Sequence, residues 1–327
     1  MPLVEAQGVA KHFRVGGSAF ATISRATVKA VAGADLAVDR GETLAVVGES
    51  GCGKSTLGRL LLGLMPPSSG RVMFDGHDLA GLGSPALRRL RARMQLVFQN
   101  PLQALDPRMS VGEQIVEPTV IHPAAGNRLP VADLLAQVGL DPALAGRFPH
   151  QLSGGQRQRV VIARAMATQP DFIVFDEPVS ALDVSVQAQI IRLIRDLQTA
   201  RGFASVFISH DLRVVRHVAD RVAVMYLGRI VEEGPVRAVF AEPLHPYTQA
   251  LIAAVPRLAP GMRRVRAVLK GEPPNPAAIP SGCPFHPRCP VAERDCRTHA
   301  PARVAAGPAR SVACIRVASG STFLPAA

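Results

Sequence analysis

A glycine-rich loop at residues 48–55 constrains this chain more than any other feature. It reads GESGCGKS and fits the pattern G-x-x-x-x-G-K-[S/T]. The apolar run Thr43–Val47 before it predicts a buried parallel strand, and a helix is expected from Ser55 to about Leu64. In such a turn, successive backbone N–H groups and the positive end of the helix face one point. The loop is therefore predicted to hold the phosphates of a nucleotide.

Two side chains of this loop have separate predicted tasks. Lys54 adds a mobile cation, and Ser55 offers a hydroxyl to Mg²⁺, which keeps several waters and needs few protein ligands. A glycine-rich loop with an incidental lysine is the alternative, but it does not account for a strand and a helix on the two flanks. The predicted nucleotide-binding residues here are Gly48, Ser50, Gly51, Gly53, Lys54, Ser55 and Thr56.

Two acids, Asp176 and Glu177, follow a second buried apolar strand, predicted over Phe172–Phe175. Asp176 is predicted to hold Mg²⁺, directly or through water. Glu177 is predicted to polarise the attacking water as a general base. Two acids at a strand end are often only a helix cap and a solvated turn, so the catalytic interpretation depends on the phosphate loop.

The remaining pattern divides the chain into parts. Strand signals fade between about residues 99 and 167, which predicts a separate helical subdomain, and a β-α-β rhythm follows it. Prolines multiply beyond about Pro243, which predicts a small appended segment with long loops. The other predicted elements are an edge strand at Arg71–Phe74, a strand at Val206–Ser209, and helices at Val131–Val138, Arg157–Ala167 and Val186–Leu197.

Size and composition set wider bounds. The chain has 327 residues, 48% of them hydrophobic, which suffices for one main domain with an appendage. No stretch approaches the roughly 18 consecutive apolar residues of a membrane-spanning helix, and the N-terminus lacks a secretory pattern, so the cytosol is expected. The formal charge of +12 suits nucleic acid, an anionic membrane face or a merely solvated surface.

The string LSGGQ at Leu152–Gln156 adds a second anion site. Ser153 and the two glycines expose backbone N–H groups at a helix N-terminus, whereas a simple cap would account for the serine alone. With the phosphate loop and the acidic strand end in this order, the chain resembles the ATP-binding cassette (ABC) family. The resemblance implies an α/β P-loop cassette with a mixed, mainly parallel core sheet, an antiparallel β subdomain and an inserted α-helical subdomain.

The resemblance also implies a division and an assembly. The ATPase core is expected at residues 1–98 and 168–240, the helical signature subdomain at 99–167, and a C-terminal extension at 241–327. In this family the signature of one subunit closes on ATP bound by another, so hydrolysis needs a head-to-tail dimer. The signature residues predicted to contact nucleotide are Ser153, Gly154, Gly155 and Gln156.

Four isolated residues match further family positions. Phe13 is similar to the aromatic that stacks on adenine, and Gln99 resembles the glutamine that senses Mg²⁺ and contacts the membrane partner. Asp183 looks like the D-loop aspartate at the dimer seam, and His210 like the switch histidine. Alone, such residues are more often core, solvated or structural. The implied catalytic set is Glu177, His210 and Gln99, and the implied Mg²⁺ set is Ser55, Gln99 and Asp176.

The tail string PLHPYTQAL at Pro243–Leu251 resembles the extension of dipeptide and oligopeptide importer ATPases. This implies a motor subunit at the cytoplasmic face of the cell membrane that couples ATP hydrolysis to peptide uptake. The implied partners are a second ABC ATPase subunit, expected to be a paralogue, two membrane-spanning permease subunits and an extracytoplasmic substrate-binding protein, without nucleic acid. Nickel or another small solute is an alternative cargo. A soluble ABC ATPase acting on nucleic acid or ribosomes is a weaker one, because neither a second cassette nor a coiled-coil insertion appears.

Four of the five cysteines lie in the tail, at Cys283, Cys289, Cys296 and Cys314. In a reducing compartment they favour metal ligation over disulfides, and four thiolates suit Zn²⁺ or an iron–sulfur cluster. The C-x5-C-x6-C-x17-C spacing fits zinc knuckles poorly. The resemblance to peptide importers implies a [4Fe–4S] cluster, with zinc or free thiols as alternatives. A rival interpretation of the whole chain makes this cluster a redox or iron sensor and the ATPase its output. Cys52 lies in the phosphate loop and is not expected to be a ligand.

Overall fold

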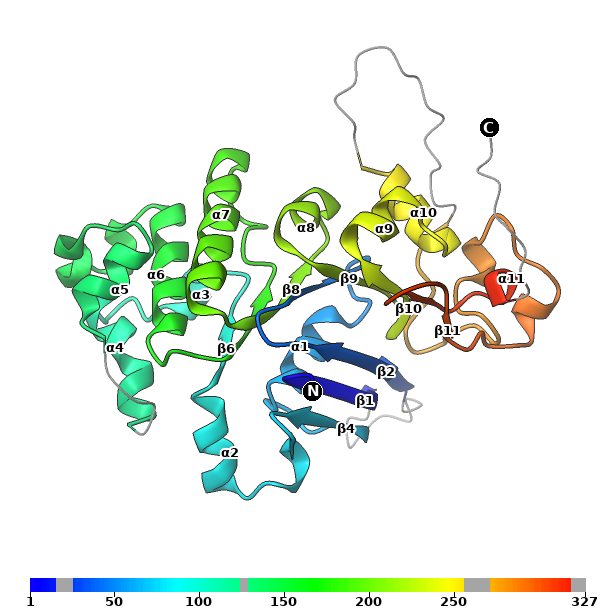
Figure 1. The fold of residues 1–327 in the computed structure, drawn as a ribbon, viewed down its shortest axis with the longest axis horizontal. Helices are drawn as coiled ribbons and strands as arrows, with labels where there is room; N and C mark the ends of the chain where they lie inside the picture. The colour runs from blue at the N-terminus through cyan, green and yellow to red at the C-terminus, as the bar shows by residue number, and fades with distance from the viewer. Residues whose placement is uncertain (16–25, 124–128, 256–270, 319–327) are drawn as a thin grey trace, which may run out of the picture.

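The structure is a computed structural model, and it describes residues 1–15, 26–123, 129–255 and 271–318. The core of the protein is an eight-stranded sheet (Figure 1). The strand order is β11-β12-β10-β9-β3-β8-β7-β6. Strands β6, β7, β8, β3 and β9 are parallel to one another, and β10, β12 and β11 continue the sheet as antiparallel strands. The strands are β3 (Thr43–Val47), β6 (Met94–Val97), β7 (Phe172–Asp176), β8 (Ala204–Ser209), β9 (Arg221–Tyr226), β10 (Arg229–Pro235), β11 (Val304–Ala305) and β12 (Ser311–Val312).

The apolar composition of the central strands fits their position. Every residue of β3, β7 and β8 is buried, as expected for parallel strands covered on both faces. The strands predicted over Thr43–Val47, Phe172–Phe175 and Val206–Ser209 are therefore confirmed, with small extensions of the last two. The mixed, mainly parallel core sheet predicted for the fold is also confirmed.

A second, antiparallel sheet packs beside the first. Its order is β2-β1-β4-β5, with β1 (Val4–Val15), β2 (Ala26–Val38), β4 (Ser69–Phe74) and β5 (His77–Asp78). The prediction of an edge strand over Arg71–Phe74 was wrong in its position, because β4 lies between β1 and the short β5. Asp75 and Gly76, both with positive φ, turn the chain back so that β5 pairs with β4.

Helix α1 (Lys54–Leu61) lies against both sheets, with contacts to β1, β2, β7 and β8. It ends before the predicted Leu64 because Gly63 takes a positive φ and two prolines follow. Helix α7 (Val184–Arg201) is longer than predicted and ends at Gly202 in the left-handed region. The other helices beside the sheets are α2 (Ser84–Arg91), α8 (Leu212–Val218) and α9 (Val236–Ala241), with the 3-10 turn η1 (Leu79–Gly81).

A helical lobe projects beyond the β6 end of the core sheet (Figure 1). It contains α3 (Pro101–Ala104), α4 (Val111–Ile121), α5 (Val131–Gln137), η2 (Pro142–Gly146), η3 (Pro149–Gln151) and α6 (Gly154–Met166). Its core includes the fully buried Ile115, Leu135 and Val160. Helices were predicted at Val131–Val138 and Arg157–Ala167; the second begins three residues earlier because Ser153 caps it.

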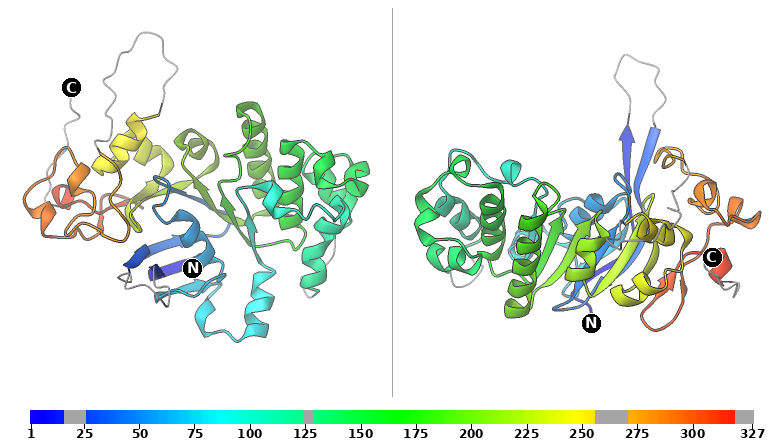
Figure 2. Two further views of the ribbon diagram at one scale, coloured as in Figure 1. Left: turned by 180° about the vertical axis from the view of Figure 1, so that it is seen from behind. Right: turned by 90° about the horizontal axis from the view of Figure 1, so that it is seen from above.

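The C-terminal extension lies at the opposite end of the molecule from the helical lobe (Figures 1 and 2). It contains α10 (Pro246–Ala253), the 3-10 turns η4 (His286–Arg288) and η5 (Asp295–Arg297), strands β11 and β12, and α11 (Ile315–Ala318). Strand β12 pairs with β10, so the tail lengthens the core sheet. This pairing was not predicted, because a two-residue strand gives almost no sequence signal.

Buried charges attach this extension to the core. The carboxylate of Glu232, which has no solvent exposure, accepts hydrogen bonds from the backbone N–H groups of Leu244 and His245 and pairs with Arg310 at 2.8 Å. Glu233 pairs with Arg303 at 2.8 Å and also with Arg221. Burial lowers the pKa of His245 to about 3, so its imidazole is neutral and accepts a hydrogen bond from the N–H of Tyr247.

Candidate nucleotide-binding site

The carboxyl ends of four adjacent parallel strands bring the predicted residues together. In the sheet register Val47 pairs with Ser209, Asp176 with Ile208, and Val97 with Phe175. The segments that follow these strand ends therefore emerge along one edge of the sheet. These are the phosphate loop after β3, His210 after β8, Glu177 after β7 and Gln99 shortly after β6. Ligands of open α/β sheets bind at such an edge.

Close backbone approach explains two glycines of the phosphate loop. A Cβ atom at Gly53, where φ is 108°, would lie 2.0 Å from the carbonyl oxygen of Ala30. A Cβ atom at Gly48 would lie 2.2 Å from the carbonyl oxygen of Met225. No larger residue fits at either position unless the backbone moves. The loop thus curls tightly against β2 and β9.

Lys54 is folded back over this loop. Its side chain is buried, and the ammonium donates hydrogen bonds to the carbonyls of Gly48 at 2.8 Å and Glu49 at 2.9 Å. The cation is therefore held at the mouth of the loop, where the phosphates of a nucleotide are expected.

Ser55 and Asp176 meet across two elements. The Ser55 hydroxyl donates a 2.8 Å hydrogen bond to Oδ1 of Asp176, which ends β7. Burial raises the pKa of Asp176, and the hydrogen bond from Ser55 opposes that rise only in part. A hydroxyl and a carboxylate are hard oxygen ligands, and Mg²⁺ takes few protein ligands beside phosphate and water. The pair therefore fits a Mg²⁺ ion bound with a nucleotide.

Glu177 lies at the centre of a three-residue cluster. Its Oε2 accepts a 3.0 Å hydrogen bond from Nε2 of Gln99, and its Oε1 lies 3.2 Å from Nδ1 of His210. Its φ of 49° is uncommon for a residue other than glycine and occurs often at functional sites. The sequence suggested these three residues one by one, and the structure places Gln99 and His210 in contact with Glu177.

The signature residues form the start of α6. Ser153 Oγ accepts a hydrogen bond from the N–H of Gln156, and the Gln156 side chain accepts one from the N–H of Ser153. This reciprocal capping box fixes the helix N-terminus. Figure 1 places α6 in the helical lobe and α1 between the two sheets. The structure therefore does not bring the signature to the phosphate loop of its own chain.

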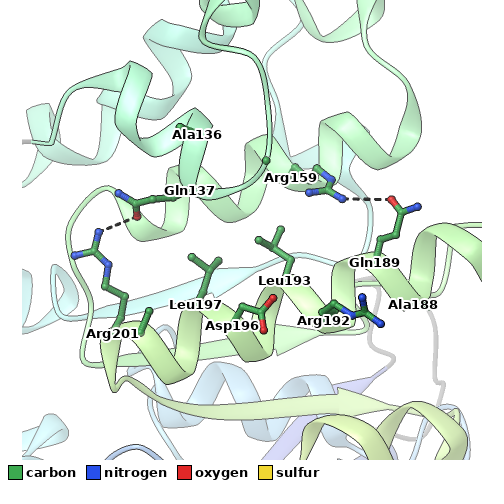
Figure 3. A pocket seen from close by; sticks show the side chains of 12 residues that line it. Ala136, Gln137, Arg159, Ala188, Gln189, Arg192, Leu193, Asp196, Leu197 and Arg201 are labelled. Carbon is green, nitrogen blue, oxygen red and sulfur yellow. Dashed lines mark hydrogen bonds between the residues drawn. The ribbon is translucent and has the colours of Figure 1, made fainter.

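Helix α6 is attached to α7 beside a groove of about 730 Å³ (Figure 3). Arg159 of α6 donates to Gln189 of α7 at 3.3 Å, and Arg201 of α7 donates to Gln137 of α5 at 2.8 Å. Asp183, predicted at a dimer seam, immediately precedes α7 and is exposed. The signature and the D-loop residue thus begin two helices that are fixed to one another.

Phe13 lies near the end of β1, opposite Val28 of β2. Its ring is 38% exposed, with the ammonium of Lys11 5.6 Å from the ring centroid. A ring with this exposure is not a core side chain, so the alternative interpretation of Phe13 as core was wrong. Its stacking on adenine stays a prediction.

The four tail cysteines line one small cavity of about 20 Å³, together with apolar side chains such as Phe285 and Ile315. Burial raises the pKa of the Cys283 and Cys314 thiols and that of Cys289 to about 11. Within the described parts of the chain, no group of three or more His, Cys, Asp or Glu side chains is placed to hold a metal ion. The structure thus gathers the predicted cysteines around one cavity, but as placed they do not form a metal-holding group.

Three contacts at Glu49, a variable position of the loop pattern, were not predicted. Its N–H donates to the hydroxyl of Tyr247 at 2.9 Å, and its carboxylate accepts two hydrogen bonds from Arg288. The tail string that contains Tyr247 resembles a family extension, but nothing in that string indicates a contact with the phosphate loop. No local pattern pairs residues so far apart in the chain.

Comparisons with known proteins agree with this site. Residues 31–180 match the family described as ABC transporter, and residues 231–296 match the C-terminal region of oligopeptide/dipeptide transporters. A probable peptide ABC transporter ATP-binding protein of Sinorhizobium fredii is 51% identical, over 95% of this chain and 89% of the relative. The oligopeptide transport ATP-binding protein AppF of Bacillus subtilis is 47% identical, over 95% of this chain and 96% of its own.

Solved structures of ATP-binding cassettes also resemble this chain. A dimeric ATP-binding cassette, MJ0796 bound to ADP and phosphate, aligns with a TM-score of 0.62 at 29% identity, over 72% of this chain and 99% of its own. The cassette cbiO1 of Clostridium perfringens aligns with a TM-score of 0.61, over 74% of this chain and 91% of its own. Among the described residues, no helix has the length and apolar character needed to cross a bilayer. The chain belongs to the ATP-binding cassette family and is an ABC-type ATPase with the C-terminal region of oligopeptide/dipeptide transporters.

Proposed function

We propose that this chain is a motor subunit of an importer that uses ATP hydrolysis to take up dipeptides or oligopeptides. One observation carries the proposal: the same chain holds an assembled nucleotide site and, at residues 231–296, the C-terminal region of oligopeptide/dipeptide transporters. The relatives named for peptide transport match both parts of the chain. We divide it into an ATPase core at 1–98 and 168–240, a helical signature subdomain at 99–167 and an extension at 241–327.

In the proposed reaction each site residue has one task. The loop amides and Lys54 bind the β- and γ-phosphates, and Ser55 and Asp176 hold Mg²⁺. When bound, Mg²⁺ neutralises charge on those phosphates. Glu177 accepts a proton from the attacking water. Gln99 and His210 orient the Glu177 carboxylate, because each of them contacts one of its two oxygens.

The proposed working unit is larger than this chain. Because α6 lies in the helical lobe, apart from α1 and the phosphate loop that precedes it, the signature is expected to contact ATP held by a second cassette, head to tail. We propose that this cassette is a paralogue and that the pair works at the cytoplasmic face of the cell membrane. Two permease subunits would dock near Gln99, and an extracytoplasmic binding protein would deliver the peptide.

The cargo is tested in the transporter complex purified from membranes. We expect ATP turnover to rise when peptides are added with their binding protein, and to stay at its basal rate with a nickel chelate. Stimulation by the nickel chelate alone would replace peptide by nickel as the cargo. Steep salt-dependent binding to RNA or DNA, without co-purification with membranes, would instead favour a soluble ATPase acting on nucleic acid.

We also propose that the four tail thiols are the ligands of a [4Fe–4S] cluster. The support is that Cys283, Cys289, Cys296 and Cys314, from three separate turns and a helix start, line one cavity. Thiolates are the ligands of such clusters, and the raised thiol pKa values mean that loading must release protons. The sulfur atoms must also shift, since they do not form a metal-holding group as placed.

The cluster is tested by its absorbance rather than by activity. Protein purified under anaerobic conditions is expected to absorb at roughly 400 nm and to contain iron. Cys289→Ser should remove both signals. Cys52→Ser is the matched control, because Cys52 is buried in the phosphate loop and lines no part of the tail cavity. Zinc, or no metal at all, in the unaltered protein would refute the cluster.

A further inference from the structure

Glu49 of the phosphate loop is held by the C-terminal extension through two groups of its own. Its backbone N–H donates a 2.9 Å hydrogen bond to the hydroxyl of Tyr247 in α10. Its carboxylate accepts hydrogen bonds from both terminal nitrogens of Arg288 in η4, at 2.7 Å and 2.9 Å. A bidentate pair of this kind is stronger and more directional than a single neutral hydrogen bond.

Both partners from the extension are buried and packed. The Arg288 side chain is 5% exposed and lies over the ring of Tyr226, 5.9 Å from its centroid. Tyr247 has no solvent exposure, and its ring packs 4.7 Å from that of Tyr226 and 5.4 Å from that of Phe285. A buried and packed anchor cannot follow a moving loop, so Glu49 is held at a fixed place.

The third group of Glu49 faces the nucleotide side. Its carbonyl accepts hydrogen bonds from the ammonium of Lys54 at 2.9 Å and from the N–H of Cys52 at 3.3 Å. Glu49 thus connects the extension to the Lys54 ammonium and to the backbone turn that Cys52 closes. A shift of Glu49 would move both the acceptor of Lys54 and the amides that face the phosphates.

We propose that Arg288 and Tyr247 are positioning residues of the ATP site, which fix the phosphate loop through Glu49. The extension is then part of the nucleotide-binding machinery and not only an appendage of the fold. Both side chains are buried, so neither is expected to touch the nucleotide itself. Their effect is on how well the loop is preorganised before ATP arrives, and a preorganised loop binds its ligand more tightly.

The test measures ATP affinity and turnover of the full-length chain with Arg288→Gln. We expect ATP to bind about 10-fold or more weakly, since a lost charge-assisted pair commonly costs an order of magnitude. The rate at saturating ATP should change less, because bound phosphates restore the loop. Arg288→Lys should recover part of the affinity. Glu49→Gln combined with Arg288→Gln should be no weaker than either alone, because both break one contact.

Arg303→Gln is the matched control. It breaks another ion pair between extension and core, with Glu233, which does not touch the phosphate loop. It should lower thermal stability without weakening ATP binding. If Arg288→Gln behaves like this control, with lower stability and unchanged ATP affinity, the proposal is overturned. If Arg288→Gln does not fold, Tyr247→Phe decides: a few-fold weaker ATP binding supports the proposal, and unchanged binding overturns it.

Discussion

Replacing Glu177 by glutamine is expected to reduce ATP turnover by at least about 100-fold while ATP still binds. Glutamine has the same shape and can stay in contact with Gln99 and His210, which lie at the two oxygens of the present carboxylate, although its NH2 group donates, so that one of these two partners must accept. It cannot accept a proton from water. Because Lys54, Ser55 and Asp176 are untouched, the phosphates and Mg²⁺ should still be held.

This outcome is checked by measuring both ATP turnover and the assembly state. Together with its partner cassette, the Glu177→Gln chain should accumulate as ATP-bound dimers in size-exclusion chromatography, because hydrolysis no longer opens them. Asp211→Asn is the matched control: this acid follows His210, pairs with Arg213 and caps α8, and asparagine caps a helix equally well. Its turnover should stay within a few-fold of normal. Undiminished turnover of Glu177→Gln, without trapped dimers, would show that the base lies elsewhere.

The parts of the site that could be predicted are those encoded locally. The run Thr43–Val47 is apolar except for Thr43 because β3 is buried on both faces, and the glycines that follow it allow the tight backbone turn of the phosphate loop. The carboxyl ends of β7 and β8 were predicted to within one residue for the same reason. Because parallel strands align their carboxyl ends, Glu177 and His210 could be expected at one edge.

What could not be predicted depends on contacts between distant segments. Arg288 and Glu49 are 239 positions apart, and neither lies in a pattern that names the other. Strand β12 has two residues and exists only because β10 offers an edge to pair with. Likewise, β4 is internal only because the turn after it lets two more residues pair. Periodicity carries no information on such partners.

The signature offers the sharpest test of the two-subunit arrangement. Ser153→Asp is expected to lower turnover by about 100-fold or more without loss of stability. Aspartate caps a helix as well as serine does, and its charge suits the positive end of α6. If that helix end contacts ATP of a second cassette, however, the new charge faces phosphates, and such repulsion costs several kcal/mol.

Ser153→Ala separates this repulsion from the loss of the cap. Alanine removes the hydroxyl that accepts from Gln156 and should cost about 1 kcal/mol of stability, with a smaller loss of turnover. Thermal melting, ATP affinity of the separate chain and turnover of the assembled transporter are measured for both variants. In the separate chain, ATP affinity should stay normal for both, because its own phosphate loop is elsewhere. Full turnover with Ser153→Asp would mean that Ser153 only caps α6, and the second half of the ATP site would then have to be sought on another surface.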